Sequence, residues 1–521
     1  MLRVAKTESG WVRGIQGSDV RTTVFRGIPF AADPVGENRW RAPQPVEPWE
    51  GVRDCIEFAP ITVQKVPGIN PDAFYSKEWH CDPEVPMDEA GSLALNIWTP
   101  AKTGDEKLPV MIWIFGGGFQ EGYCHEMEFD GEAMNRKGVI LVSIPYRLNV
   151  FGFLAHPDLT KEDPENPTNF GLLDQNYAIA WVKRNIANFG GDPDNITIFG
   201  QSAGGGSTMF QCTSPKSAGL FDKAISQSAA GIPTTYPRCF IPLADPMETA
   251  EERGVRFLHD WLGVDTIEEA RKLDWRFVEE QYQKSHLRFT ANIDGKFVLD
   301  QWYERAMAGQ LNPKYLMIGN TDNEFIYTPG DDPEKWLKDS FGDNAEKYRE
   351  ACGGDIYKKV LGFDLTEKLL CEALADIGRP IYYYTFGPTI PGDEAGAFHS
   401  SDLWFVFETL NKCWRPFDGH HYDLARKMAN YWTNFAKTGD PNGVDQDGTP
   451  MPEWKTYSRE EPNQMLFMDE VSTTKELSDQ TACLLEINRY LLNDPEARAK
   501  NLDAFFSITS TSNAKYGKAH P

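Results

Sequence analysis

The sequence predicts an α/β fold in which a mostly parallel central sheet is covered by helices on both faces. Short, continuous apolar runs at residues 93–98, 110–115 and 140–144 have the length and composition of buried strands. A segment with apolar residues at helical spacing, 176–188, follows these runs and ends near a pair of glycines. Strands that alternate with helices in this way are typical of a layered α/β domain.

Composition describes a large acidic chain of 521 residues, with 52 Lys and Arg against 77 Asp and Glu and a formal net charge of −25. We therefore expect no contact with nucleic-acid phosphates or anionic membranes through a basic surface. The apolar runs are far shorter than the roughly 20 residues of a membrane-spanning helix. The nine cysteines include no CxxC pair, so the sequence predicts neither a zinc site nor a complete disulfide framework. This favours a cytoplasmic location, and a mature secreted form is the alternative.

The remaining segments follow in order along the chain. Residues 4–30 contain short strand-like runs between glycines and predict a small leading sheet, whereas 31–87 are rich in Pro, Trp and acidic residues and predict surface loops. Beyond the helix at 176–188, four further strands are predicted at 196–199, 224–226, 315–318 and 381–386.

We expect one catalytic domain over residues 1–490, followed by a C-terminal tail over 491–521. Two inserts, near 233–314 and 331–370, carry charged and aromatic residues at helical spacing. They predict a helical cap that overhangs the sheet.

The most informative motif is Gly-Gln-Ser-Ala-Gly at residues 200–204, directly after the predicted strand at 196–199. The pattern G-x-S-x-G fits a sharp strand-to-helix turn, because side chains at the flanking positions would clash in such a bend. Ser202 would then be exposed at the end of the strand. The bare pattern also arises by chance in a chain with 44 glycines, so the prediction depends on the strand before it and the helix after it.

A serine hydroxyl becomes a useful nucleophile only when a base accepts its proton and a third group orients that base. His399 is the candidate base, since it lies in a loop after the predicted strand at 381–386. His420 and His421 are alternatives, but the residues around them predict the start of a surface helix.

Asp322 and Glu324 both follow the predicted strand at 315–318, so either could be the orienting acid. Donors for an oxyanion are expected from the three glycines at 116–118, which follow a buried strand, together with the backbone N–H of Ala203. The sequence contains no HExxH, GxxxxGK[ST] or strand-linked GxGxxG motif, so no metal or cofactor is predicted.

Taken together, these features resemble the type-B carboxylesterases, a family that includes cholinesterases and bacterial para-nitrobenzyl esterases. The resemblance runs from about Val4 to Tyr490 through many collinear blocks. They include residues 25–31, 39–43, 95–100, 115–119, 146–148, 151–154, 171–175, 189–193, 225–228, 319–324 and 434–441.

The resemblance implies an α/β-hydrolase fold and hydrolysis of small-molecule carboxylic esters through an acyl-Ser202 intermediate. Because the acid of this family is usually Glu, it favours Glu324 over Asp322. By position, the family's roles go to Ser202 as nucleophile, His399 as general base, Glu324 as orienting acid, and Gly117, Gly118 and Ala203 as oxyanion donors.

The chain also departs from the family pattern. Gln201 stands where Glu commonly precedes the serine. At the usual Ser-Glu-Asp-Cys motif the sequence reads Glu-Ala-Gly-Ser over 89–92, so Ser92 replaces a disulfide cysteine and Ala90 is expected to remove the acid that would pair with Arg39.

Two alternatives remain at this point. The first is a catalytically silent binding protein like the family's adhesion members, which typically lack a triad residue. The second is a hydrolase of the same mechanism that acts on amides, carbamates or phenolic esters, because fold and triad do not define the acyl pocket.

Overall fold

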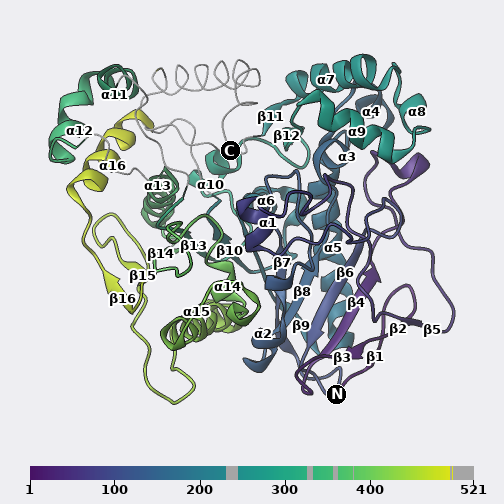
Figure 1. Cartoon of the computed structure of the whole chain (residues 1–521), viewed down its shortest axis with the longest axis horizontal. Coiled ribbons are helices and arrows are strands. Elements are labelled where there is room, and N and C mark those ends of the chain that lie inside the picture. Colours follow the sequence, from purple (N-terminus) through teal and green to yellow (C-terminus); the bar gives the residue numbers. More distant parts are fainter. Residues whose placement is uncertain (230–243, 325–332, 356–361, 380, 493–495, 497–521) are drawn as a thin grey trace.

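The computed structural model of the protein describes residues 1–229, 244–324, 333–355, 362–379, 381–492 and 496. A long twisted sheet runs through the molecule (Figure 1). Its described strands have the order β16-β15-β14-β13-β10-β9-β7-β8-β6-β4-β3. All neighbouring pairs from β8 to β15 are parallel, whereas the pairs at both ends of the sheet are antiparallel. The predicted fold class is therefore confirmed.

The strands of this sheet from β6 to β14 occupy the predicted apolar runs, whereas β15 and β16 were not predicted. The bounds of the sheet strands are β3 Ile15–Gln16, β4 Thr23–Pro29, β6 Ala94–Thr99, β7 Leu108–Ile114, β8 Ile140–Ile144, β9 Gly191–Gln201, β10 Lys223–Gln227, β13 Tyr315–Thr321, β14 Ile381–Phe386, β15 Gln464–Phe467 and β16 Val471–Thr474. Every residue of β6 and β8 is buried, which explains why these strands show no alternation of apolar and polar residues.

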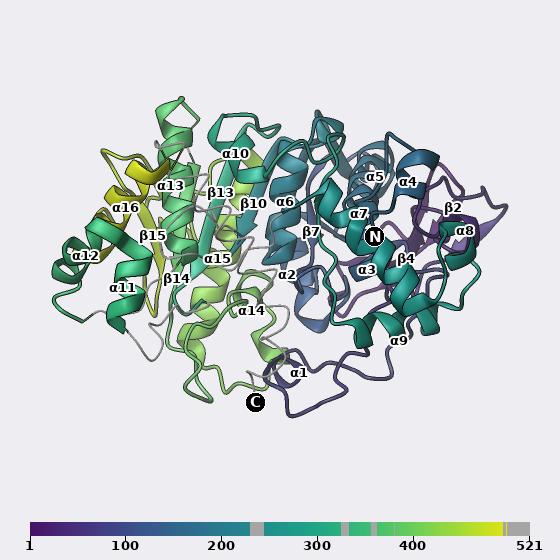
Figure 2. The same cartoon turned by 90° about the horizontal axis from the view of Figure 1, so that it is seen from above.

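Helices cover both faces of the sheet (Figure 2). On one face α5 (Phe170–Asn185) and α6 (Ala203–Thr213) pack against β9, and α13 (Gly362–Asp376) packs against β14. On the other face α2 (Glu132–Arg136) and α15 (Gly419–Thr438) pack against the sheet, with α14 (Leu403–Val406) beside α15. The predicted helix at 176–188 corresponds to α5, which begins six residues earlier.

The described parts of the two inserts form two helical groups, at the upper right and upper left of Figure 1. The first contains β11 (Asp245–Pro246), α7 (Met247–Arg256), α8 (Ile267–Ala270), α9 (Trp275–Ser285) and β12 (Asn292–Ile293). The helix α10 (Trp302–Met307) lies apart from this group and packs against α6 and α13. The second contains α11 (Pro333–Phe341) and α12 (Ala345–Ala351), which packs against α16 (Asp479–Leu492). The first group lies near α3 (Asn149–Phe153) and α4 (Pro157–Glu162) (Figure 1).

The N-terminal region contains the predicted small sheet, formed by β1 (Val4–Lys6), β2 (Trp11–Arg13) and β5 (Val52–Asp54). The region 31–87 is mostly loop, but it also contains β5 and the short helix α1 (Phe74–Glu78).

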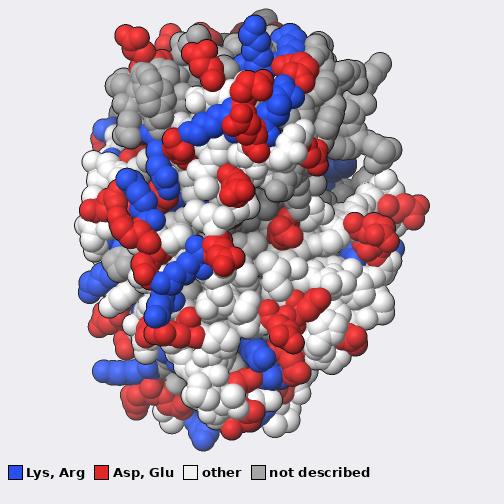
Figure 3. Space-filling model, turned by 90° about the vertical axis from the view of Figure 1, so that its left-hand side faces the viewer, with Lys and Arg blue, Asp and Glu red and all other residues white. Residues whose placement is uncertain are grey.

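The surface and the thiols complete the description. The face in Figure 3 carries acidic and basic residues interspersed over its visible area. In the described ranges no helix combines the length and apolarity that crossing a bilayer requires. The cysteines within those ranges are all free thiols.

Candidate active site

Ser202 lies in a strained turn between β9 and α6. Its backbone has φ of 57° and ψ of −125°, a conformation that costs free energy for a residue with a side chain. The turn needs glycine on both sides. A Cβ atom on Gly200 would lie 2.4 Å from the carbonyl oxygen of Gly204, and one on Gly204 would lie 2.0 Å from that of Ile114. The Ser202 N–H donates to the carbonyl of Gln227 at 2.9 Å. The predicted strand-to-helix turn is thus present.

The strand order brings the other candidate residues to the same edge as Ser202. In the sheet, β14 neighbours β13, and β10 lies between β13 and β9. Glu324 follows β13 and His399 lies in the loop after β14. The carboxyl ends of parallel strands meet at one edge, where α/β proteins place their ligand sites.

Glu324 and His399 form a buried hydrogen-bonded pair. His399 Nδ1 contacts Glu324 Oε2, and Oε1 of the same carboxyl accepts the backbone N–H of Thr321 at 3.0 Å. Burial alone would raise the pKa of Glu324, but the attraction and hydrogen bond of His399, with further hydrogen bonds from Ser228 and the Thr321 N–H, outweigh burial and lower that pKa. Asp322 is exposed on the same turn, so of the two acids the contact with His399 is made by Glu324.

His399 Nε2 faces Gln201. The Nε2 atoms of the two side chains are 3.3 Å apart, and within the described residues the Ser202 hydroxyl makes no hydrogen bond to the imidazole. The hydroxyl of Tyr75, from α1, lies 3.5 Å from the carbonyl oxygen of His399, and the ring of Phe363 stacks near the imidazole. Residues from several elements therefore surround the loop that carries His399.

The glycines at 116–118 form a tight loop directly against the Ser202 turn. A Cβ atom on Gly116 would lie 3.2 Å from that of Ser202. Gly117 and Gly118 have φ of 94° and 63°, values that favour glycine. The carbonyl of Gly118 accepts hydrogen bonds from Arg288 Nη2 at 2.9 Å and Gln120 Nε2 at 3.2 Å. Both bonds restrain the peptide planes of this loop.

Comparisons with known proteins agree with this geometry. The family model described as "Carboxylesterase family" matches residues 2–359 and 336–484. The chain belongs to the carboxylesterase family. It is 32% identical to fumonisin B1 esterase of Sphingopyxis macrogoltabida over 482 residues, which cover 84% of this chain and 82% of that one. It is also 32% identical to dog carboxylesterase 5A over 531 residues, covering 92% and 88% of the two chains.

Solved structures of similar shape include two esterases. A PNB esterase has a TM-score of 0.73 at 27% identity and covers 93% of this chain and 100% of its own. A carboxylesterase of Geobacillus stearothermophilus has a TM-score of 0.73 at 28% identity with the same coverage. The protein is therefore a carboxylic ester hydrolase with the α/β-hydrolase fold.

The structure of this carboxylesterase adds an acid that sequence reasoning missed. Asp402 is fully buried three residues after His399, where its carboxylate accepts Gln227 Nε2 at 2.8 Å and the Tyr384 hydroxyl at 3.2 Å. Desolvation raises the pKa of Asp402 to about 6. Its place in the same loop as His399 was the available sequence signal, but a buried acid cannot be distinguished from a solvated one by position alone.

The rival histidines of the carboxylesterase lie elsewhere. Asp418 caps the start of α15, and the Nδ1 atom of His421 accepts the N–H of Asp418 to complete a capping box. His421 Nε2 contacts the carbonyl of Thr389 at 2.9 Å. His420 is partly exposed beside Asp418. These contacts explain both histidines as parts of the helix start, as the flanking residues predicted.

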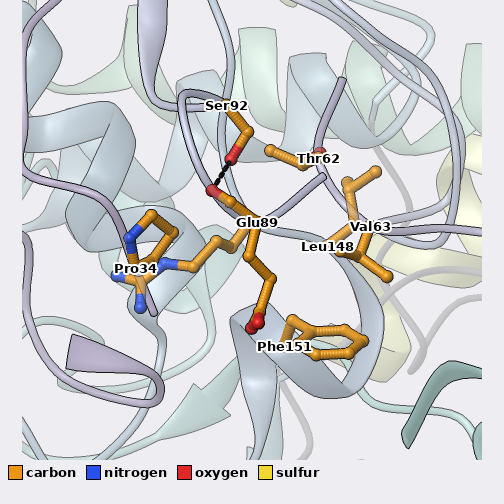
Figure 4. Close-up of a pocket in the computed structure, with 8 residues that line it drawn as sticks. Pro34, Thr62, Val63, Glu89, Ser92, Leu148 and Phe151 are labelled. Atoms are coloured by element: carbon orange, nitrogen blue, oxygen red, sulfur yellow. Dashed lines mark hydrogen bonds between the residues drawn. The ribbon is translucent and has the colours of Figure 1, made fainter. Parts of the chain in front are cut away.

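One expectation about the Arg39 partner is wrong. Arg39 pairs with Glu89 rather than lacking an acid: its Nε donates to Glu89 Oε1 at 2.7 Å, and both side chains are buried. The expectation placed this acid at position 90, whereas in the structure it comes from the preceding residue, Glu89. Figure 4 shows the small pocket beside this carboxylate, where the Ser92 hydroxyl donates to the Glu89 carbonyl.

Proposed function

We propose that this carboxylesterase acts through an acyl-enzyme intermediate on Ser202, with His399 as general base and Glu324 as orienting acid. The observation that carries the proposal is the buried contact between Glu324 and His399 Nδ1 at the sheet edge where the strained turn presents Ser202. A proton on Nδ1 leaves the lone pair on Nε2, which is the tautomer a general base needs.

In the proposed first half-reaction, Ser202 Oγ attacks the ester carbonyl carbon and its proton passes to His399 Nε2. The tetrahedral intermediate then collapses: the carbon–oxygen bond to the alcohol breaks, and His399 returns the proton to the leaving oxygen. Water repeats the sequence on the acyl-serine, with one proton passing through His399, and releases the carboxylic acid and free Ser202. The Glu324 carboxylate stabilises the imidazolium that forms in each step.

We further propose that the oxyanion is held by the backbone N–H groups of Gly117, Gly118 and Ala203. Support comes from the contact between the glycine loop and the Ser202 turn, and from the position of Ala203 at the first residue of α6. A helix N-terminus favours negative charge. Loss of one such donor typically costs about 3 to 4 kcal/mol of transition-state stabilisation.

The finer features of the protein are also proposals. We propose one catalytic domain over 1–490, with cap inserts near 233–314 and 331–370, followed by a tail over 491–521. Its proposed binding partners are small-molecule esters and not nucleic acid. A cytoplasmic location is favoured by the free thiols of the described cysteines.

The neighbouring acids Glu324 and Asp322 provide a matched test of the mechanism. Glu324→Gln should lower kcat for an aryl acetate by about 10³ to 10⁴-fold, because the amide favours the wrong histidine tautomer. Asp322→Asn, on the same turn, should retain near-normal turnover. An organophosphonate should label wild-type Ser202, as located by peptide mass spectrometry, and Ser202→Ala should be neither labelled nor active. Near-normal activity of Ser202→Ala would refute the mechanism, and an unlabelled, inactive wild type would favour a binding protein.

A further inference from the structure

The residue that precedes Ser202 makes two hydrogen-bond contacts with the histidine loop. Gln201 ends β9 and its side chain is 2% exposed. Its Nε2 lies 3.3 Å from His399 Nε2, while its Oε1 accepts the hydroxyl of Ser400 at 3.0 Å. Ser400 has a positive φ of 81°, an unusual conformation for serine that brings its hydroxyl to the amide. Both contacts are internal to the proposed site.

These contacts favour one protonation state of the His399 imidazole. The Ser400 hydroxyl donates to Oε1, which directs the amide nitrogen of Gln201 toward His399. In this orientation the amide nitrogen donates, which fits a neutral His399 that accepts at Nε2 and carries its ring proton on Nδ1. Nδ1 faces the Glu324 carboxylate, an acceptor. The contacts at the two ring nitrogens therefore fit the same neutral tautomer.

We propose that Gln201 is a positioning residue for ester hydrolysis, which keeps the resting His399 imidazole neutral with its lone pair on Nε2. The inference rests on the proposed roles of Ser202 and His399. Because a hydrogen bond to the neutral form disfavours protonation, the amide extends the active pH range of the enzyme toward acid. A carboxylate at position 201, the residue common in the family, would instead favour the imidazolium.

The bond from Gln201 belongs to the resting enzyme. Nε2 has one lone pair, which the Ser202 hydroxyl must engage when the ester binds and the proton is transferred. Gln201 therefore has to yield Nε2 to Ser202 during the reaction, and its contribution is to the charge state of the free enzyme. We accordingly expect substitutions at 201 to change the pH dependence of kcat/KM more than the maximal kcat.

Other ionisable groups near His399 stay constant in this comparison. Glu324 contacts Nδ1, Asp402 lies behind it in the same loop, and the Tyr75 hydroxyl approaches the His399 carbonyl from α1. None of these groups is altered by a substitution at Gln201. A change in the acidic limb of the pH profile can then be assigned to the group that faces Nε2.

The test compares kcat/KM for an uncharged aryl acetate from about pH 5 to about pH 9 at constant ionic strength. Gln201→Glu should shift the midpoint of the acidic limb upward by about 1 unit or more, because a negative charge at this distance favours the imidazolium. Gln201→Met and Ser400→Ala should shift it in the same direction by less. Gln310→Glu, which adds the same charge at an exposed position after α10, should leave the midpoint unchanged.

Two outcomes separate this inference from the proposed function. If an organophosphonate labels Ser202 in wild type and variants alike, but the midpoints of Gln201→Glu and Gln201→Met equal that of wild type, Gln201 does not act through His399. If the phosphonate fails to label wild-type Ser202, the proposed function itself is wrong. Phosphonate labelling also measures the concentration of folded active sites, so the rate of a poorly folded Gln201→Glu preparation can be corrected. The uncharged Gln201→Met variant gives a second measurement of the direction in which the midpoint of the acidic limb shifts.

Discussion

A pair of carboxyl groups outside the proposed mechanism provides a quantitative test of the structure. Glu126 and Glu128 lie near each other in the segment between the glycine loop and α2. Glu128 is 1% exposed, and in the described residues no protein donor reaches either of its carboxyl oxygens. Desolvation and the charge of Glu126 raise the pKa of Glu128 well above its usual value. Desolvation also raises the pKa of Glu126 from 4.5 to about 7, despite the N–H of Tyr123 that it accepts at 2.9 Å.

The sign of the effect follows from proton binding. A group with a raised folded pKa holds a proton in the native state that it has lost in the unfolded state, so it destabilises the fold progressively as pH rises between the two pKa values. For Glu126 this interval runs from 4.5 to about 7. At 1.36 kcal/mol per unit, the shift corresponds to about 3 kcal/mol, which is a large part of the stability of a typical domain.

Glu128→Gln should remove the part of the pH-dependent penalty that Glu128 itself contributes, because the pKa of this buried carboxyl is raised well above its usual value. Its amide cannot ionise and can donate to the Glu126 carboxylate, so the free energy of unfolding of the variant should exceed that of wild type increasingly from about pH 5 to about pH 8. We expect this gain to grow throughout the interval and to be largest at its alkaline end.

Urea unfolding followed by tryptophan fluorescence, with refolding to confirm reversibility, measures this difference. Glu50→Gln, at an exposed loop position, controls for the lost charge. A difference between Glu128→Gln and wild type that stays constant with pH would refute the proposed protonated pair.

Three further predictions concern other contacts. Arg39→Met should destabilise the protein by about 3 to 5 kcal/mol in urea unfolding, because it leaves Glu89 buried without its partner. A second change, Glu89→Leu, should recover part of this loss. Full stability of the single variant would contradict the burial of this pair. Gly206→Ala should stabilise α6 by up to about 1 kcal/mol, since a Cβ atom there meets nothing within 4 Å. Gly204→Ala should instead abolish folding or activity. Equal thermal unfolding midpoints of the two variants would count against the tight turn around Ser202. Arg288→Met should lower kcat by about 10-fold through loss of the charged donor to the Gly118 carbonyl. Arg276→Met, at an exposed position, is the control. An unchanged kcat of Arg288→Met would show that the glycine loop does not need this bond.

Much of the sheet could be predicted from local sequence because its central strands are buried on both faces. The run at 110–115 and the observed β7 differ by only a few residues at each end. The direction of each strand was harder to predict from the sequence. β6 has the same continuous apolar character as β7, yet it is antiparallel to both of its neighbours. Periodicity reports burial and carries no information about the direction of the neighbouring strand.

Contacts between distant segments were the part that sequence could not supply. The partner of Arg39 was misassigned because the acid was expected at position 90, whereas Glu89 makes the contact with Arg39 across 50 residues of the sequence. The contact of Gln201 with His399 joins residues 198 positions apart, and the Arg288 contact with Gly118 joins residues 170 apart. Motifs identify which residue types are present near Ser202. The surrounding charges depend on how the loops pack.

The choice between Asp322 and Glu324 illustrates this limit. Both acids follow β13, so position alone left them equal, and only the family resemblance favoured Glu324. In the structure the Asp322 N–H donates to the Phe386 carbonyl, and Asn323 forms a parallel bridge with Phe398. This bridge aligns the turn after β13 with the residue before His399. The next residue, Glu324, is thereby carried to the imidazole, while Asp322 remains exposed. The backbone pairing of Asn323 with Phe398 therefore accounts for the acid that reaches His399.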